Sequence, residues 1–205
     1  MSARGKRQRG NTIVEFAVAT MFLLPLLLGT VNVGMNISRS IQVTQLSRDA
    51  GHMYVRFVDF SQPANQDLIV RLATGLGMTR TGGNAKVVLT RVMKIGAEQC
   101  AAGGLQLQDC TNYQMPVITQ QIIIGNPALS PSALGEPPSN LKNDKGEISM
   151  SDYLTDVRTR AVGFDAILTL QPGELAYVAE AESVAPEFSF PGFFEQTRVY
   201  SRTIY

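Results

Sequence analysis

The sequence predicts an α+β protein, in which a long N-terminal α-helix, membrane-spanning in its first half, packs on a small antiparallel β-sheet. Three observations predict this fold. A basic start is followed by an uncharged apolar run, the run continues into an amphipathic segment, and later segments rich in β-branched residues are separated by turn-forming clusters. With 44% hydrophobic and 17% charged residues, the 205-residue chain is not intrinsically disordered.

The N-terminal segment combines a basic start with a membrane-length apolar run. Four basic residues and no acidic residue occur in the first ten positions, and the sixteen residues from Phe16 to Val31 carry no charge. A helix needs roughly 20 apolar residues to cross a bilayer, and basic residues stay on its cytoplasmic side. A cleaved secretory signal shares these features, but no small-x-small cleavage site follows the run.

Glu15 lies at the edge of this apolar run, and the first turn offers it no basic partner. A carboxylate inside an apolar span is costly, so by default it has a function and a partner. Cleavage after Gly10 would supply that partner, because Asn11 would then carry a free α-amino group four residues before Glu15.

The order of basic leader, Gly10, four further residues, Glu15-Phe16 and a long apolar helix resembles the class III leader of bacterial type IV pilins. The Glu-Phe form of the G-x-x-x-x-E-F/Y pattern is most similar to the TadE-like family, minor pilins of Tad (tight adherence) systems. Residues 38–57 resemble the family's helix extension, and the segments LQPGE (170–174) and FPGFF (190–194) resemble TadE-like heads.

This resemblance implies a pilin-like fold and a structural function, as a minor pilin or pseudopilin in the assembly or initiation of a Tad-type pilus. A prepilin peptidase would cleave between Gly10 and Asn11, leaving a helix anchored in the inner membrane and a periplasmic head. Glu15 and Phe16 would then serve subunit assembly, with other pilin-like subunits and the pilus assembly platform as partners. The protein could also be associated with the pilus or the cell surface, and so with cell adhesion.

The chain therefore divides into a basic prepilin leader (1–10), a transmembrane and extended amphipathic helix (11–60) and a periplasmic α+β head (61–205). Apolar residues spaced four apart continue to Phe57, and no proline occurs between Pro25 and Pro63. We therefore expect one helix from about residue 12 to about residue 59.

Within the head, β-branched residues predict strands at Lys86–Ile95 and Met115–Ile124, and leucine spacing predicts a short helix between 68 and 76. Cys100 and Cys110 lie between the two strands. Two cysteines outside the cytoplasm favour a disulfide, so we expect a strand pair joined by a disulfide-closed loop.

The C-terminal part of the chain is predicted to start with a long, proline-rich surface loop at 125–146. A short helix capped by Ser151 or Asp152 should follow within 151–160. The turn Gln171-Pro172-Gly173 predicts a β-hairpin. Its strands would be Ala166–Leu170 and Leu175–Ala181, with an aromatic-rich connection at 186–194 and a terminal strand at Val199–Tyr205.

Catalytic and cofactor chemistry has little support in the sequence. No phosphate-binding glycine loop or nucleophile motif occurs, and one His with two Cys gives few metal ligands, so we expect no enzyme, cofactor or metal. Glu180 and Glu182 are expected on a solvated strand face, and a net charge of +1 indicates no nucleic-acid partner.

Two alternative functions remain open. One is an uncleaved single-pass membrane protein whose periplasmic head is a binding module, and the native N-terminus distinguishes it from a pilin. The other is a secreted hydrolase that uses carboxylates, which would need converging acids in a concave site.

Overall fold

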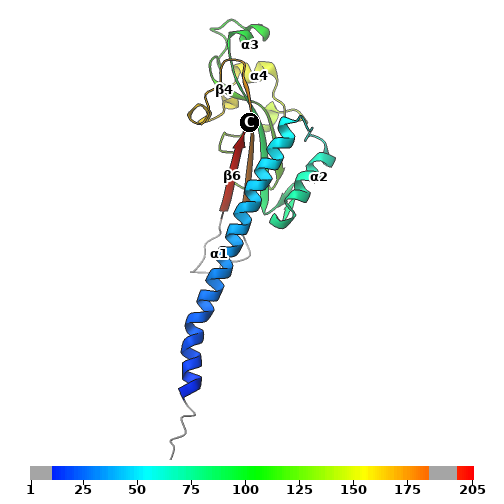
Figure 1. Ribbon diagram of the computed structural model, residues 1–205. Coiled ribbons are helices and arrows are strands. Elements are labelled where there is room, and N and C mark those ends of the chain that lie inside the picture. Colours follow the sequence, from blue (N-terminus) through cyan, green and yellow to red (C-terminus); the bar gives the residue numbers. More distant parts are fainter. Residues whose placement is uncertain (1–10, 185–197) are drawn as a thin grey trace, which may run out of the picture. The chain divides into compact units, whose positions relative to one another are not determined.

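The computed structural model describes residues 11–184 and 198–205 (Figure 1). The predicted leader and the aromatic-rich connection at 186–194 lie outside these residues. The chain forms two compact units, Met1–Ser38 and Arg39–Tyr205. The second unit thus includes the last part of the long helix together with the whole sheet.

Helix α1 (Asn11–Val55) contains the predicted membrane-competent segment. From Thr12 to Val55 it is long and apolar enough to cross a membrane. Pro25 lies inside the helix without ending it. Prolines are tolerated in membrane-spanning helices, where neighbouring groups and local adjustment satisfy the freed backbone carbonyl.

Helix α1 ends at Val55, four residues before the predicted end near Asp59. Phe57 adopts a left-handed conformation with φ of 62°. Its N–H donates to the Tyr54 carbonyl at 3.0 Å, and the Val58 N–H donates to the Met53 carbonyl at 3.1 Å. This is the Schellman pattern of helix termination, which the apolar spacing of the sequence does not reveal.

The second unit is built on a four-stranded antiparallel sheet with strand order β4-β3-β5-β6. This confirms the two strands predicted around the cysteines and the predicted C-terminal strand. The bounds of the four strands are β3 (Ala85–Lys94), β4 (Pro116–Gly125), β5 (Leu175–Val184) and β6 (Arg198–Ile204).

Short elements link α1 to the sheet and connect its strands. The predicted short helix is present as α2, which begins earlier in the chain than predicted, and the described part of the head also contains two further helices and a two-stranded ribbon. Their bounds are α2 (Pro63–Leu72), β1 (Met78–Thr79), β2 (Gly82–Gly83), α3 (Ala97–Ala102) and α4 (Met150–Thr155), with 3₁₀ turns at Thr74–Leu76, Ser139–Leu141, Val157–Thr159 and Phe164–Ala166.

The second part of α1 lies along one face of the sheet (Figure 1). Its buried residues recur every three or four positions, which is the spacing of one helix face. They pack on alternate residues of the strands, which point to the same side of the sheet. The members of this core include Val43, Leu46, Ala50 and Tyr54 from α1, and Val87, Leu89, Ala179 and Ala181 from the sheet.

Small residues allow α1 to approach the sheet closely. A Cβ atom on Gly51 would lie 2.4 Å from Cε2 of Tyr205, too close for any residue other than glycine without displacing the ring. The Ser47 hydroxyl donates to the Ala179 carbonyl at 2.9 Å and lies 2.8 Å from the Thr203 hydroxyl. These contacts fix the C-terminal strand against the helix.

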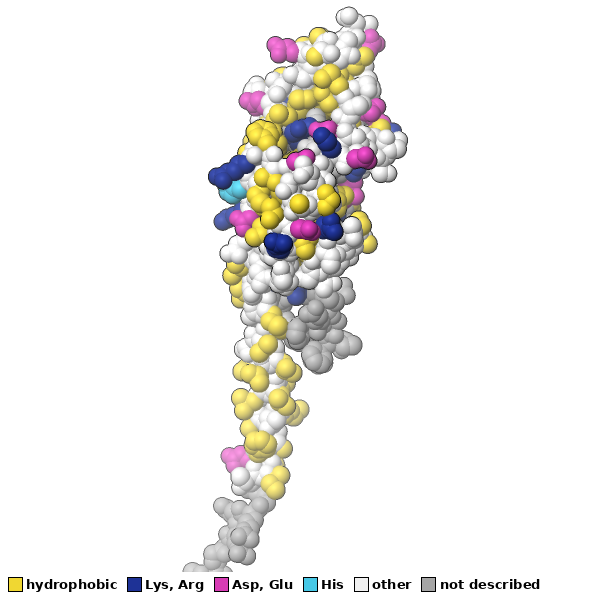
Figure 2. Space-filling model, turned by 90° about the vertical axis from the view of Figure 1, so that its right-hand side faces the viewer, with side chains coloured by type: hydrophobic (Ala, Val, Ile, Leu, Met, Phe, Trp, Pro, Cys, Tyr) yellow, Lys and Arg dark blue, Asp and Glu magenta, His cyan; other side chains and the backbone are white. Residues whose placement is uncertain are grey.

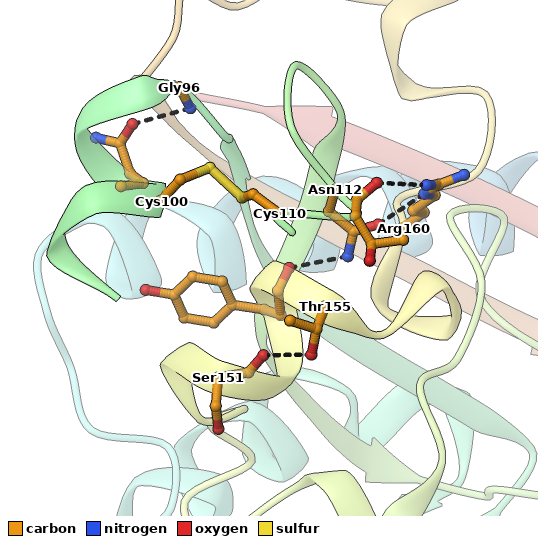
Figure 3. Close-up of a disulfide and its surroundings, with 10 residues drawn as sticks. Gly96, Cys100, Cys110, Asn112, Ser151, Thr155 and Arg160 are labelled. Carbon is orange, nitrogen blue, oxygen red and sulfur yellow. Dashed lines mark hydrogen bonds between the residues drawn. A yellow bond between two sulfur atoms is a disulfide. The ribbon is translucent and has the colours of Figure 1, made fainter. Parts of the chain in front are cut away.

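A second core contains the predicted disulfide, which joins Cys100 to Cys110 with their Cα atoms 5.9 Å apart. Both cysteines are buried. Nearby, the buried Asn112 amide donates to the carbonyls of Tyr153 and Asp156, and its Oδ1 accepts a 2.7 Å hydrogen bond from Arg160 Nε (Figure 3). The disulfide thus closes the β3–β4 loop on itself, and the Asn112 side chain ties this loop to α4 and the segment after it.

Removal of the disulfide should destabilise the head measurably. Replacing Cys100 and Cys110 together by Ala is expected to lower the free energy of unfolding by about 3 kcal/mol, because the unfolded chain gains the freedom that the closed loop removes. Non-reducing peptide mapping should show the linked pair in the wild type, and chemical denaturation should measure the loss. A double variant as stable as the wild type would contradict a stabilising role.

Two predictions for the C-terminal part are wrong. The helix cap is Ser149, whose hydroxyl accepts from the Asp152 N–H, so α4 begins at Met150. The predicted strand at Ala166–Leu170 does not exist. The turn is present, since the Glu174 N–H donates to the Gln171 carbonyl at 3.0 Å, but β5 pairs with β3 and β6 instead.

The second face of the sheet is also covered, by the middle of the predicted surface loop. Leu134 is fully buried and Ser132 is nearly so. As a result Glu180 and Glu182 are only 3% and 5% exposed, and the prediction of a solvated face is wrong. Both faces of β5 are buried, because alanines face α1 on one side and residues 130–136 cover the other.

Candidate functional site

The predicted processing site is only partly described by the structure. Gly10 lies outside the described residues, whereas Asn11 is the first residue of α1. Glu15 and Phe16 follow within the same helix. Four residues correspond to about 6 Å along a helix axis, so the backbone at Glu15 lies little more than one turn from the start of α1.

Glu15 and Phe16 are both exposed, Phe16 at 72%. Within the described residues, no hydrogen bond or ion pair reaches the Glu15 carboxylate. Figure 2 shows one acidic side chain near the start of the helix, among hydrophobic side chains on the visible face. The Glu15 carboxylate is therefore available to a partner other than the described residues of this chain.

Several other polar side chains in this part of α1 form hydrogen bonds within the helix. The Thr20 hydroxyl donates to the Phe16 carbonyl at 2.7 Å, and the Thr30 hydroxyl donates to the Leu27 carbonyl at 2.8 Å. The Asn36 amide donates to Asn32 Oδ1 at 2.8 Å. Such internal bonds suit a lipid environment, where no water replaces a missing partner. Glu15 differs from these residues, because its side chain has no such bond to any described residue.

The first unit exposes an unusually large apolar surface. None of the most apolar window of α1 is buried within the protein, and water solvates such a continuous surface poorly. The exposed members include Met21, Phe22, Leu23, Leu24, Leu26, Leu27 and Leu28. This helix is compatible with a single-pass membrane anchor.

The remaining predicted site residues, Cys100 and Cys110, lie together in the second unit as a buried disulfide. A buried disulfide presents no reactive thiolate, so its role is structural. Among the described residues, no group of three His, Cys, Asp or Glu side chains is placed to hold a metal ion.

Sequence reasoning missed a buried polar cluster on the second face of the sheet. Lys86, 2% exposed, pairs with Glu136 at 3.5 Å and donates to the Ser130 carbonyl. Glu180 accepts hydrogen bonds from Ala133 N–H at 3.0 Å and from the Tyr200 hydroxyl at 2.6 Å. Burial, followed by this bond, raises the pKa of Tyr200.

Glu182 completes the cluster as a buried carboxylate beside an exposed cation. Arg198 Nε lies 3.1 Å from Glu182 Oε1, although that oxygen has no partner with hydrogen-bond geometry. In the strand register, Lys86 stands opposite Glu182, so the sheet pairs residues of opposite charge. That pairing becomes visible only once the strand order is known.

A comparison with models of protein families finds a match for the N-terminal helix. Residues 10–52 match the family model described as "TadE-like protein", a range that includes Glu15, Phe16 and Gly51. None of the curated proteins or solved structures compared with the chain matches it. The match confirms the resemblance that the leader and the Glu-Phe pattern indicate, and it associates the chain with the Tad pilus. Over residues 10–52, the chain thus carries a TadE-like segment.

Proposed function

We propose that this protein is a minor pilin or pseudopilin that acts in the assembly or initiation of a Tad-type pilus. In this proposal it is processed after Gly10, anchored in the inner membrane by α1, and carries its head in the periplasm. The observation that supports it most is Glu15, an exposed carboxylate without a partner among the described residues at the start of an apolar helix.

Processing gives Glu15 a chemical role. Cleavage after Gly10 creates an ammonium group on Asn11, and in a low-dielectric layer this charge and the Glu15 carboxylate attract each other strongly. Between subunits, the ammonium of one chain would pair with Glu15 of its neighbour. Leaving either charge unpaired in lipid is unfavourable, so the pair would select one register between packed helices.

The partners in this proposal are a prepilin peptidase, other pilin-like subunits and the pilus assembly platform. The role is structural and needs neither an enzymatic activity nor a cofactor. Phe16 would contribute to the same contact, because it follows Glu15 directly and exposes its ring.

The native N-terminus tests this proposal. Mass mapping of protein purified from the membrane should find Asn11 as the first residue, and Gly10→Val should leave the leader attached. Gly5→Val is the matched control, since it makes the same change within the leader and should still be processed. A wild-type chain that starts at Met1 or Ser2 would instead favour an uncleaved membrane protein whose head is a binding module.

A further inference from the structure

Helix α1 ends in a conformation that costs stability. Phe57, with φ of 62°, is strained because a bulky side chain disfavours the left-handed region. It occupies the position that glycine usually takes in a Schellman ending. Burial offsets little of this cost, since the residue is 79% exposed. Strained residues gather at functional sites, so the surroundings of this ring are a candidate binding site.

A cavity of about 120 Å³ lies beside Phe57. Tyr54 and Tyr177 form part of its wall, and the Tyr177 ring meets the rings of Tyr54 and Phe57 edge-on, with centroids 5.3 and 6.3 Å apart. An apolar cavity of about 150 Å³ holds benzene, whereas sites for drug-sized ligands and cofactors measure roughly 300–1,000 Å³. By volume, the cavity therefore fits about one side chain.

Arg91 lines the same cavity from the middle of the sheet. It stands between Gln120 of β4 and Tyr177 of β5 in the strand register, next to a β-bulge between positions 91 and 92. Bulges redirect side chains and are frequent beside binding sites. The Arg91 Nε donates to the Thr119 hydroxyl at 2.9 Å.

The charge on Arg91 has no carboxylate partner within 11–184 and 198–205, where none of the ion pairs includes it. Asp59 also lines the cavity. Its carboxylate, however, already accepts hydrogen bonds from Ser61 and Gln62. A half-buried guanidinium beside a cavity lined in part by aromatic rings therefore favours a ligand that brings its own negative charge.

We propose that this space, the Arg91 cavity, binds a segment of another protein in which an apolar side chain is next to a carboxylate. The apolar side chain would fill the space beside the Tyr54, Phe57 and Tyr177 rings, and the carboxylate would pair with the planar guanidinium. Figure 2 shows hydrophobic side chains gathered on the face of the head over α2 and around the end of α1, with basic side chains among them. The proposal concerns residues 39–205 alone, so it does not depend on processing at Gly10.

Peptide titration of the full chain in detergent micelles tests the chemistry of the ligand. The probes are three peptides with blocked ends, Gly-Phe-Glu-Gly, Gly-Phe-Gln-Gly and Gly-Ala-Glu-Gly. We expect the Phe-Glu peptide to shift the NMR signals of Phe57 and Tyr177. It should bind roughly tenfold more tightly than either of the others, which lack the charge or the ring.

Paired variants separate binding from folding. Phe57→Gly and Arg91→Gln should each weaken binding of the Phe-Glu peptide roughly tenfold, whereas the controls Leu72→Ala and Arg80→Gln, exposed positions outside the cavity lining, should not. Phe57→Gly should keep or raise the melting temperature, because glycine relieves the left-handed strain. Equal binding by all variants, or by the Phe-Gln peptide, would overturn the proposal. So would concentration-dependent shifts at Phe57 and Tyr177 without peptide, which would make a second copy the occupant.

Discussion

Glu15→Gln is expected to abolish pilus assembly while leaving processing and membrane insertion intact. Glutamine has nearly the shape of glutamate, and a neutral side chain inserts into lipid at a lower cost, so the anchor should form normally. The variant has no negative charge to meet the Asn11 ammonium of a neighbouring subunit. The measurements are the N-terminal mass of the membrane-bound protein, its co-purification with other pilin-like subunits, and the pili counted on cells.

Asp49→Asn is the matched control for this experiment, since it makes the same chemical change at an exposed position of the same helix, outside the apolar run. We expect normal assembly from it. If Glu15→Gln formed pili and co-purified with other subunits as the wild type does, Glu15 would have no role in assembly and would simply be a carboxylate accommodated at the membrane edge. Loss of processing in that variant would move its role to recognition by the peptidase.

Glu180→Ala is expected to lower the free energy of unfolding of the head by about 3 kcal/mol. The Glu180 carboxylate accepts hydrogen bonds from the Ser132 hydroxyl, the Ala133 N–H and the Tyr200 hydroxyl. It therefore holds the covering segment and the edge strand β6 to the sheet. Alanine would leave the buried Ser132 hydroxyl and two part-buried donors without this acceptor, and would upset the balance of charge near Lys86.

The chain has no tryptophan, so chemical denaturation is best followed by tyrosine fluorescence and near-ultraviolet circular dichroism. Glu180→Gln should show a smaller loss, because its amide oxygen still accepts a hydrogen bond. Asp144→Ala removes an exposed acid and should change stability by less than about 0.5 kcal/mol. If Glu180→Ala matched this control, the cluster would contribute nothing to the fold.

The sequence by itself determined the features that depend on local pattern. Charge asymmetry and an apolar run of membrane length predict the anchor, because crossing a bilayer requires little beyond length and hydrophobicity. The spacing of Gly10 and Glu15 leads to the TadE-like resemblance, which the match over residues 10–52 confirms. Strands β3 and β4 and the disulfide between them follow from β-branched composition and from two cysteines.

Only the tertiary structure decided the features that depend on which surfaces meet. The alternation of alanine and glutamate in β5 is compatible with a solvated acidic face. Glu180 and Glu182 are nevertheless buried, because a loop distant in the sequence covers them. The strand predicted before Gly173 is absent because β5 finds its partners in β3 and β6, far away in the sequence. Likewise, Phe57 and Arg91 line one cavity only because the end of α1 meets the middle of the sheet. Non-local pairings of this kind depend on packing free energy rather than on local propensity.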